Sequence, residues 1–204
     1  MSLPPRRASR LALLAAGIGL LLGGAALWLG LEQGATAQWG FGAACLLQVP
    51  PSLSLWSRLR EGLGNRGLEG ERLTIRIVSH LLSLLALGLA LTSVVALLAD
   101  RSPQAEPFAL PLALVAVGCQ AALWVAKRGL AGIHPTLDLD ASRSRTLLEL
   151  AALFLVGTLL GRAFPWADAV VGLVMALRLF LEGRTLAKGT AFPAVSGGCG
   201  GGCC

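Results

Sequence analysis

The chain has 204 residues, of which 55% are hydrophobic and 14% are charged, and its mean hydropathy is +0.72. These values lie outside the range of soluble globular proteins and predict a chain embedded in a lipid bilayer. The net charge of +6 does not indicate a nucleic-acid partner, because the basic residues collect in the connections between apolar segments. No serine–histidine–acid set, phosphate loop or redox-cofactor motif stands out, so we expect neither an enzyme nor a required cofactor.

The apolar segments predict an all-α polytopic membrane helix bundle. A helix needs about 20 predominantly apolar residues to cross about 30 Å of hydrocarbon. The expected spans are residues 11–31, 38–56, 73–99, 108–126, 147–160 with its flanks, and 167–181. The first is longer than the apolar core of a signal peptide, so we expect a retained helix. The second is the weakest, because Gln48 interrupts it and Pro50-Pro51 predicts a break or kink.

Basic residues set the expected orientation. They collect before the first span, between spans two and three, between spans four and five, and after the sixth, whereas the opposite side holds only Arg101 and Arg162. Because basic connections stay in the cytoplasm, both termini are expected to face the cytoplasm from the cell (inner) membrane. We divide the chain into a basic N-terminus at residues 1–10, a transmembrane domain at 11–188, and a flexible tail rich in glycine and cysteine at 189–204.

The last two spans carry a recognisable pattern. Asp140-Ala141 is expected at the opening of the fifth helix, Gly157 lies further along it, and Trp166-Ala167-Asp168 opens the sixth before an aliphatic run. With six spans and cytoplasmic ends, this pattern resembles the transmembrane domain of the cation diffusion facilitator family of divalent-metal/proton antiporters. The resemblance implies metal efflux by proton antiport from a homodimer.

The metal ligands that this resemblance implies are absent. The family's fifth helix carries a His and, four residues later, an Asp, but these positions are Arg143 and Leu147 here. Its second helix supplies a further pair, and residues 44–51 contain no carboxylate or imidazole. In residues 189–204, which follow the sixth span, we expect no counterpart of the family's cytoplasmic domain. A divalent ion needs about four ligands with lone pairs, so we do not expect exchange through the usual tetrahedral site.

Ionisable residues within the spans are candidates for a transport path, because charges at membrane depth are costly and commonly functional. His80 in the third span and Glu149 in the fifth each lie about one helical turn into the membrane from the cytoplasmic side. At this shared depth they would together form a proton relay or an ion site. In the alternative, Glu149 pairs with Arg145 on its own helix, and His80 bonds to Ser79 or Ser83.

The last two spans contain three further features that bear on structure or function. Asp168 is either a third transport-path residue at an outer vestibule or a cap at a helix N-terminus. Arg178 is expected to pair with Glu182, four residues later on the same helix. Gly157 and Gly161 have the spacing of small residues that lets another helix approach closely, which gives weak support to a dimer.

The sharpest chemical pattern is the end of the chain, where Cys199, Cys203 and Cys204 are separated by glycines. Thiolates prefer soft or borderline ions such as Cu(I), Zn(II), Cd(II) or Hg(II), and a cytoplasmic location argues against a structural disulfide. One tail supplies three sulfur ligands, and a dimer partner would add a fourth. The alternatives are a redox pair, a lipidation site, or a tail with incidental thiols.

Two functions stay open. The first is a cation transporter for heavy or divalent metals, in which the tail delivers the ion and His80, Glu149 and Asp168 serve the membrane path. The second is a transport-inactive, membrane-anchored accessory that binds metal through its tail or binds a partner. The expected partners are the lipid bilayer, a metal cation and a second copy of the chain.

Overall fold

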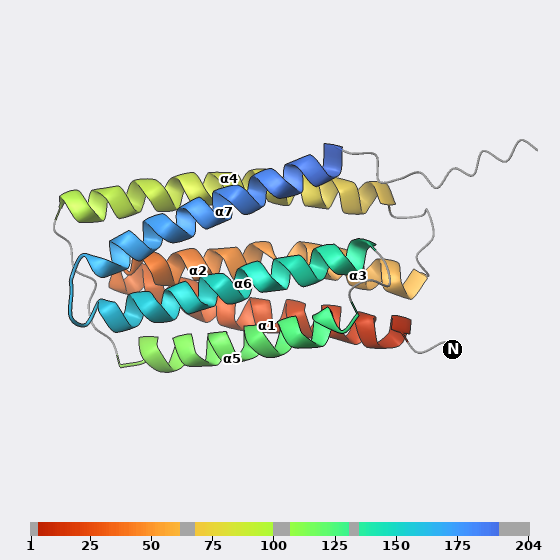
Figure 1. Ribbon diagram of the computed structural model, residues 1–204, viewed down its shortest axis with the longest axis horizontal. Helices are drawn as coiled ribbons and strands as arrows, with labels where there is room; N and C mark the ends of the chain where they lie inside the picture. Colours follow the sequence, from red (N-terminus) through yellow and green to blue (C-terminus); the bar gives the residue numbers. More distant parts are fainter. Residues whose placement is uncertain (1–3, 62–67, 100–106, 131–134, 192–204) are drawn as a thin grey trace, which may run out of the picture.

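The structure is a computed structural model that describes residues 4–61, 68–99, 107–130 and 135–191. Within these ranges it contains helices and turns and no strand, so the predicted all-α fold is confirmed (Figure 1). The helices are α1 Pro4–Gln33, α2 Thr36–Leu47, α3 Val49–Glu61, α4 Leu68–Leu98, α5 Ala109–Arg128, α6 Pro135–Leu160 and α7 Ala167–Ala191.

Three of the described helices are long and apolar enough to cross a membrane. The qualifying segments are Arg7–Gln33 of α1, Leu73–Leu98 of α4, and Ala109–Arg128, which is the whole of α5. Their outer faces carry large apolar side chains: Leu21 on α1 is 74% exposed and Leu98 on α4 is 83% exposed. Contiguous apolar surface of this kind suits contact with lipid and not with water.

The expected second span is two helices that meet at Gln48. Pro50 and Pro51 lie in the first turn of α3. The N–H groups of a first turn have no acceptor within the helix, so the missing proline N–H costs no intrahelical hydrogen bond. The Ser52 N–H and hydroxyl both donate to Gln48 O, at 3.3 and 3.0 Å, so the chain stays hydrogen-bonded across the junction. The predicted interruption of this segment is confirmed, and it falls just before the two prolines.

The last two helices are longer than the predicted spans. α6 begins at Pro135, a favoured residue for the first helical turn, and not near residue 147. α7 continues to Ala191, beyond the expected end at residue 181. These additional turns carry most of the charged residues of both helices.

The helices form two packed groups. α4 and α7 lie side by side along one edge of the molecule, as Figure 1 shows, and α1, α2, α3, α5 and α6 form the other group. The core lies between the groups. There, Phe41 of α2 stacks on Phe154 of α6 with ring centroids 5.5 Å apart, beside the fully buried Leu89 of α4 and Met175 of α7.

Glycines allow α1 and α2 to approach at backbone distance. A Cβ added at Gly42 of α2 would lie against Leu27 N and 2.8 Å from Gly23 O, and one added at Gly23 of α1 would lie 3.0 Å from Gly42 O. Gly157 of α6 faces Ala37 of α2 and Val171 of α7, each at 3.3 Å from a built Cβ. Small residues therefore bring helices of the same chain together, as in other membrane bundles.

We predict that Gly42→Ala destabilises the bundle. The added methyl group meets backbone atoms of α1, and overpacking of this kind costs about 1–3 kcal/mol. Gly24→Ala is the matched control, because its Cβ meets nothing within 4 Å and gains the same helix propensity. Denaturant unfolding in detergent, followed by circular dichroism, measures both. Equal stability of the two variants would contradict close packing at this seam.

Candidate functional site

Charged side chains gather in the half of the bundle away from Asp168, which we call the basic half. Its buried or half-buried basic side chains are Arg58, Lys127, Arg143 and Arg178, and its half-buried acidic ones are Asp140, Glu149 and Glu182. Charges in an apolar interior need partners, because desolvation of an unpaired ion costs several kcal/mol. The pairing of these groups therefore determines what chemistry this half can perform.

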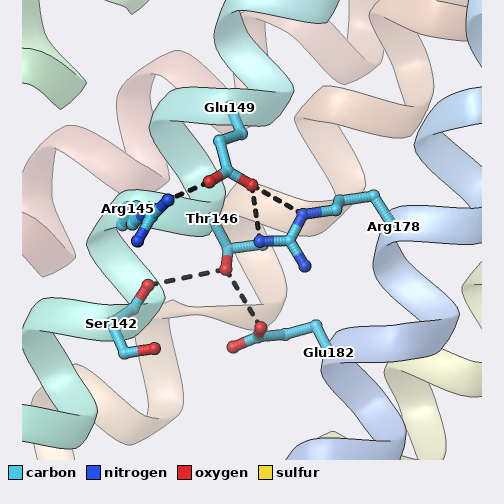
Figure 2. Close-up of polar contacts among 6 residues, drawn as sticks. All are labelled: Ser142, Arg145, Thr146, Glu149, Arg178 and Glu182. Carbon is cyan, nitrogen blue, oxygen red and sulfur yellow. Dashed lines mark hydrogen bonds and ion pairs between the residues drawn. The ribbon is translucent and has the colours of Figure 1, made fainter.

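Glu149 is held by two arginines, as Figure 2 shows. Its Oε1 accepts a hydrogen bond from Arg145 Nε at 3.1 Å, one turn earlier on α6. Its Oε2 accepts a hydrogen bond from Arg178 Nε at 2.6 Å and forms an ion pair with Arg178 Nη2 at 2.5 Å, and Arg178 comes from α7. The predicted pair of Glu149 and Arg145 is confirmed. The predicted pair of Arg178 and Glu182 is wrong, because Arg178 reaches across to α6.

Glu182 is held by a neutral donor from the neighbouring helix. The Thr146 hydroxyl on α6 donates to Glu182 Oε2 at 3.0 Å, and Ser142 O lies 3.5 Å from the same hydroxyl (Figure 2). With the contact between Glu149 and Arg178, this gives α6 and α7 two polar cross-links. Both cross-links lie within the packed surface between the two helices, so they fix the register of α7 on α6.

Lys127 and Asp140 form a buried ion pair between α5 and α6. Lys127 Nζ lies 2.9 Å from each Asp140 carboxylate oxygen, and the side chains are 5% and 13% exposed. Asp140 was expected to open its helix, but it lies in the second turn, because α6 begins at Pro135. Both oxygens of Asp140 are thus satisfied by one cation.

Arg143 and Leu147 occupy the positions at which the family resemblance implies metal ligands. Both are buried, at 5% and 8% exposure. Leu147 packs in the hydrophobic core, and the rings of Phe41 and Phe154 fill the contact between α2 and α6 further along. Among the described residues, no group of three or more His, Cys, Asp or Glu side chains gathers to hold a metal ion.

His80 does not share a site with Glu149. It is exposed on α4 and lines an apolar groove of about 680 Å³ between α4 and α7, with Leu84, Leu177 and Phe180 among its walls. Glu149 instead directs both oxygens to arginines. The alternative partners of His80 are also engaged elsewhere: the Ser79 hydroxyl donates to Arg76 O at 2.7 Å, and the Ser83 hydroxyl donates to Ser79 O at 3.0 Å.

Asp168 caps a helix, but not its own. It lies in the first turn of α7, is 6% exposed, and accepts three hydrogen bonds from the start of α2. Thr36 N and Thr36 Oγ1 donate to Oδ2 at 2.6 and 2.7 Å, and Ala37 N donates to Oδ1 at 3.3 Å. The preceding residue, Ala35, supplies no side-chain cap. One carboxylate therefore meets the positive ends of two helices, which is a favourable electrostatic arrangement.

The cysteine site lies outside the described residues, which end at residue 191, so capture of a metal ion by Cys199, Cys203 and Cys204 stays a prediction. The two described cysteines are in the bundle. Cys45 is fully buried in the core and accepts a hydrogen bond from Gln120 Nε2 at 3.9 Å, and Cys119 is half-buried.

Sequence reasoning missed Thr36, Lys127 and the contact between α6 and α7. A signal existed for Lys127 and Asp140, which have opposite charge and flank a short connection. Thr36 also had one, because Thr near a helix start commonly accepts or supplies a cap. No local pattern joins Glu149 to Arg178, because these residues are 29 positions apart and become neighbours only in the fold.

No protein-family model matches the chain, and no curated protein matches it either. Its function is therefore argued from the residues described above.

We predict that Glu149 is coupled more strongly to Arg178 than to Arg145. The contact with Arg178 is two-pronged and half-buried, which corresponds to a coupling free energy of about 1–2 kcal/mol. Arg145 is 68% exposed, so its coupling is expected to be about 0.3–0.5 kcal/mol. Two double-mutant cycles with alanine, read by unfolding in detergent, measure both values. Equal coupling free energies would contradict a stronger contact of Glu149 with Arg178 across the two helices.

We also predict that Asp168→Ala lowers the free energy of unfolding by about 2–4 kcal/mol, because it leaves buried N–H groups of Thr36 and Ala37 without acceptors. Asp168→Asn keeps one acceptor oxygen and is expected to lose less. Glu32→Ala, which removes an exposed acid at the end of α1, is the control and should change little. Unchanged stability of Asp168→Ala, or an equal loss in Glu32→Ala, would contradict the capping role.

Proposed function

We propose that the protein is a six-span membrane protein with the layout of the cation diffusion facilitator family that does not carry divalent cations, and that it acts as a membrane-anchored metal-binding accessory. The observation that carries the proposal is the burial of Arg143 and Leu147 where the resemblance implies metal ligands. A guanidinium repels a cation, and an aliphatic side chain offers it no lone pair.

Three carboxylates of the described helices also support this proposal, because each is already engaged. Asp140 is bound by Lys127, Glu149 by Arg145 and Arg178, and Asp168 by the start of α2. A dehydrated divalent ion at membrane depth would have to displace these donors and leave a cation or buried N–H groups unpaired. Each displaced contact adds a penalty that the ion must offset before it gains any ligand.

The tail supplies the metal-binding part of the proposal. Three thiols within six residues, separated by glycines, suit a soft or borderline ion, and the glycines let the backbone bring the sulfurs together. The distribution of basic residues supports a cytoplasmic tail, where the thiols stay reduced. In this arrangement the bundle anchors the tail at the membrane surface, and a second copy of the chain is the source of a fourth ligand.

The second candidate is antiport through a non-standard path, and one observation favours it. The groove between α4 and α7 is large, and the exposed imidazole of His80 lies at its edge. Its other walls are apolar apart from Ser83, so a cation in the groove would have few ligands besides this imidazole. The groove is therefore weaker evidence for transport than the engaged carboxylates are against it.

The test combines flux and binding with the full chain. We expect no uptake of Zn(II), Cd(II) or Cu(I) above empty vesicles in proteoliposomes with an imposed proton gradient. We expect stoichiometric metal binding to purified protein, abolished by the triple change Cys199→Ser, Cys203→Ser and Cys204→Ser. Cys119→Ser is the matched control and should leave binding unchanged, because Cys119 lies in the bundle.

Flux above empty vesicles that disappears in Glu149→Gln or His80→Ala would overturn the proposal in favour of antiport. Absence of both flux and metal binding would leave the membrane anchor without a metal role, and it would equally contradict the accessory function. A positive flux control with an unrelated zinc ionophore shows that the vesicles are sealed and the reporter responds.

A further inference from the structure

The groove between α4 and α7 has apolar walls and space for a ligand. It measures about 680 Å³, which lies within the range of about 300–1,000 Å³ that is usual for ligand sites. Its large apolar walls are Leu84 and Leu87 of α4 and Leu177 and Phe180 of α7, and all four side chains are exposed. Exposed apolar surface that is hollowed in this way calls for an apolar occupant in place of water.

Basic side chains gather at one end of this groove. His80 lines the groove on α4, and Arg76 lies one turn earlier on the same face of that helix. On α7, the Arg184 guanidinium lies over the ring of Phe180, 5.7 Å from its centroid, and Phe180 is itself a wall of the groove. We call Arg76, His80 and Arg184 the basic end of the groove.

The two sides of the basic end lie at the same level of the bundle. A Cβ added at Gly183 of α7 would lie 3.0 Å from Ser79 O of α4. These residues adjoin Arg184 and His80 in the chain, so both basic side chains belong to the same end of the groove (Figure 1). Among the described side chains, no carboxylate lines the groove or forms an ion pair with the basic end. Its two arginines are therefore available to an anionic group.

The groove has the length of one bilayer leaflet. Its walls on α4 extend from His80 to Ala90, and this separation of ten residues corresponds to about 15 Å of helix. That is half of the hydrocarbon thickness, which is about 30 Å. A helix from a second copy would cross both leaflets, and the exposed Leu84 and Leu177 would hold it away, since membrane helices approach closely at small residues. A groove of this length with positive charge at one end fits a single lipid molecule.

We propose that the groove binds one phospholipid with an anionic headgroup. The acyl chain lies against Leu84, Leu87 and Leu177, and the phosphate accepts hydrogen bonds from the basic end. Basic pockets between membrane helices suit anionic headgroups, whereas the ammonium of a zwitterionic headgroup would bring a like charge to the two arginines. The site concerns the bundle, so it does not rest on the metal-binding role of the tail.

The first test measures lipid binding to the full chain, delipidated in detergent, by native mass spectrometry. We expect one phosphatidylglycerol molecule to bind more tightly than phosphatidylcholine. Arg184→Gln should weaken phosphatidylglycerol binding about fivefold, and Arg184→Gln combined with Arg76→Gln about 30-fold, because each arginine near the membrane surface adds a similar attraction to an anionic lipid. Binding of phosphatidylcholine should stay unchanged in both variants.

Arg128→Gln is the matched control for this test. Arg128 is also exposed and lies over an aromatic ring, 5.3 Å from the centroid of Trp124, but on α5 and outside the groove. Equal affinity of the wild type for the two lipids, or an equal loss in Arg128→Gln, would overturn the proposal. Glycerol phosphate has the headgroup chemistry without acyl chains, and its competition with phosphatidylglycerol at equal concentration would reduce the groove to a phosphate site and contradict a lipid site.

The second test locates the lipid in a bilayer. Phosphatidylcholine nanodiscs carry a small fraction of phosphatidylglycerol with a photoactivatable acyl chain, and the crosslinked peptides are identified by mass spectrometry. We expect labelling beside Leu84 and Leu177 that an excess of unlabelled phosphatidylglycerol removes. Ala90→Phe fills the apolar part of the groove and keeps both arginines, so it should reduce this labelling. Labelling beside Leu21, which is exposed on α1, should resist both changes.

Two results of the second test would contradict the proposal. Labelling of the groove that resists competition as labelling beside Leu21 does would show exchange with bulk lipid and no specific site. Crosslinks between two copies of the chain across the groove would show that a second copy occupies it.

Discussion

The pairing of charges inside an apolar bundle is the constraint on which the rest of the structure depends. Glu149 on α6 and Arg178 on α7 are half-buried and form an ion pair between the two helices, which offsets the cost of removing each charge from water. Their contact fixes the register of α7 on α6, and with that register Thr146 reaches Glu182. At the other end, the same register brings Asp168 to the start of α2. A chain of polar contacts thus positions α2, α6 and α7 around the core made by Phe41, Phe154 and Met175.

The fold class was predictable because it depends on local properties. Runs of apolar residues require helices in a bilayer, since every backbone N–H and C=O must be satisfied within the segment. The break in the second segment was also readable, because Pro50 and Pro51 cannot lie inside an uninterrupted helix. The bounds of α6 and α7 could not be predicted from hydropathy, because turns that carry charged residues are also helical. The charged side chains of these turns contact neighbouring helices.

The candidate site was predictable only where its contacts are local. The pair of Arg145 and Glu149 follows from a spacing of four residues on one helix. By the same rule Arg178 was assigned to Glu182, and the rule failed because the packing of α7 on α6 brings Arg178 to Glu149 instead. Asp168 was expected to cap a helix start and does so, but the choice of α2 over α7 depends on how the helices pack.

The arrangement of charges bears directly on which ions the bundle suits. A cation carrier needs carboxylates or imidazoles that are free at membrane depth, and here Asp140, Glu149 and Asp168 are each held by donors of the same chain. Arg143 is the reverse case: a cation with unused N–H groups beside a cavity. Neither these three carboxylates nor Arg143 is suited to bind a divalent metal. In the proposed function, metal binding therefore belongs to the thiols of Cys199, Cys203 and Cys204.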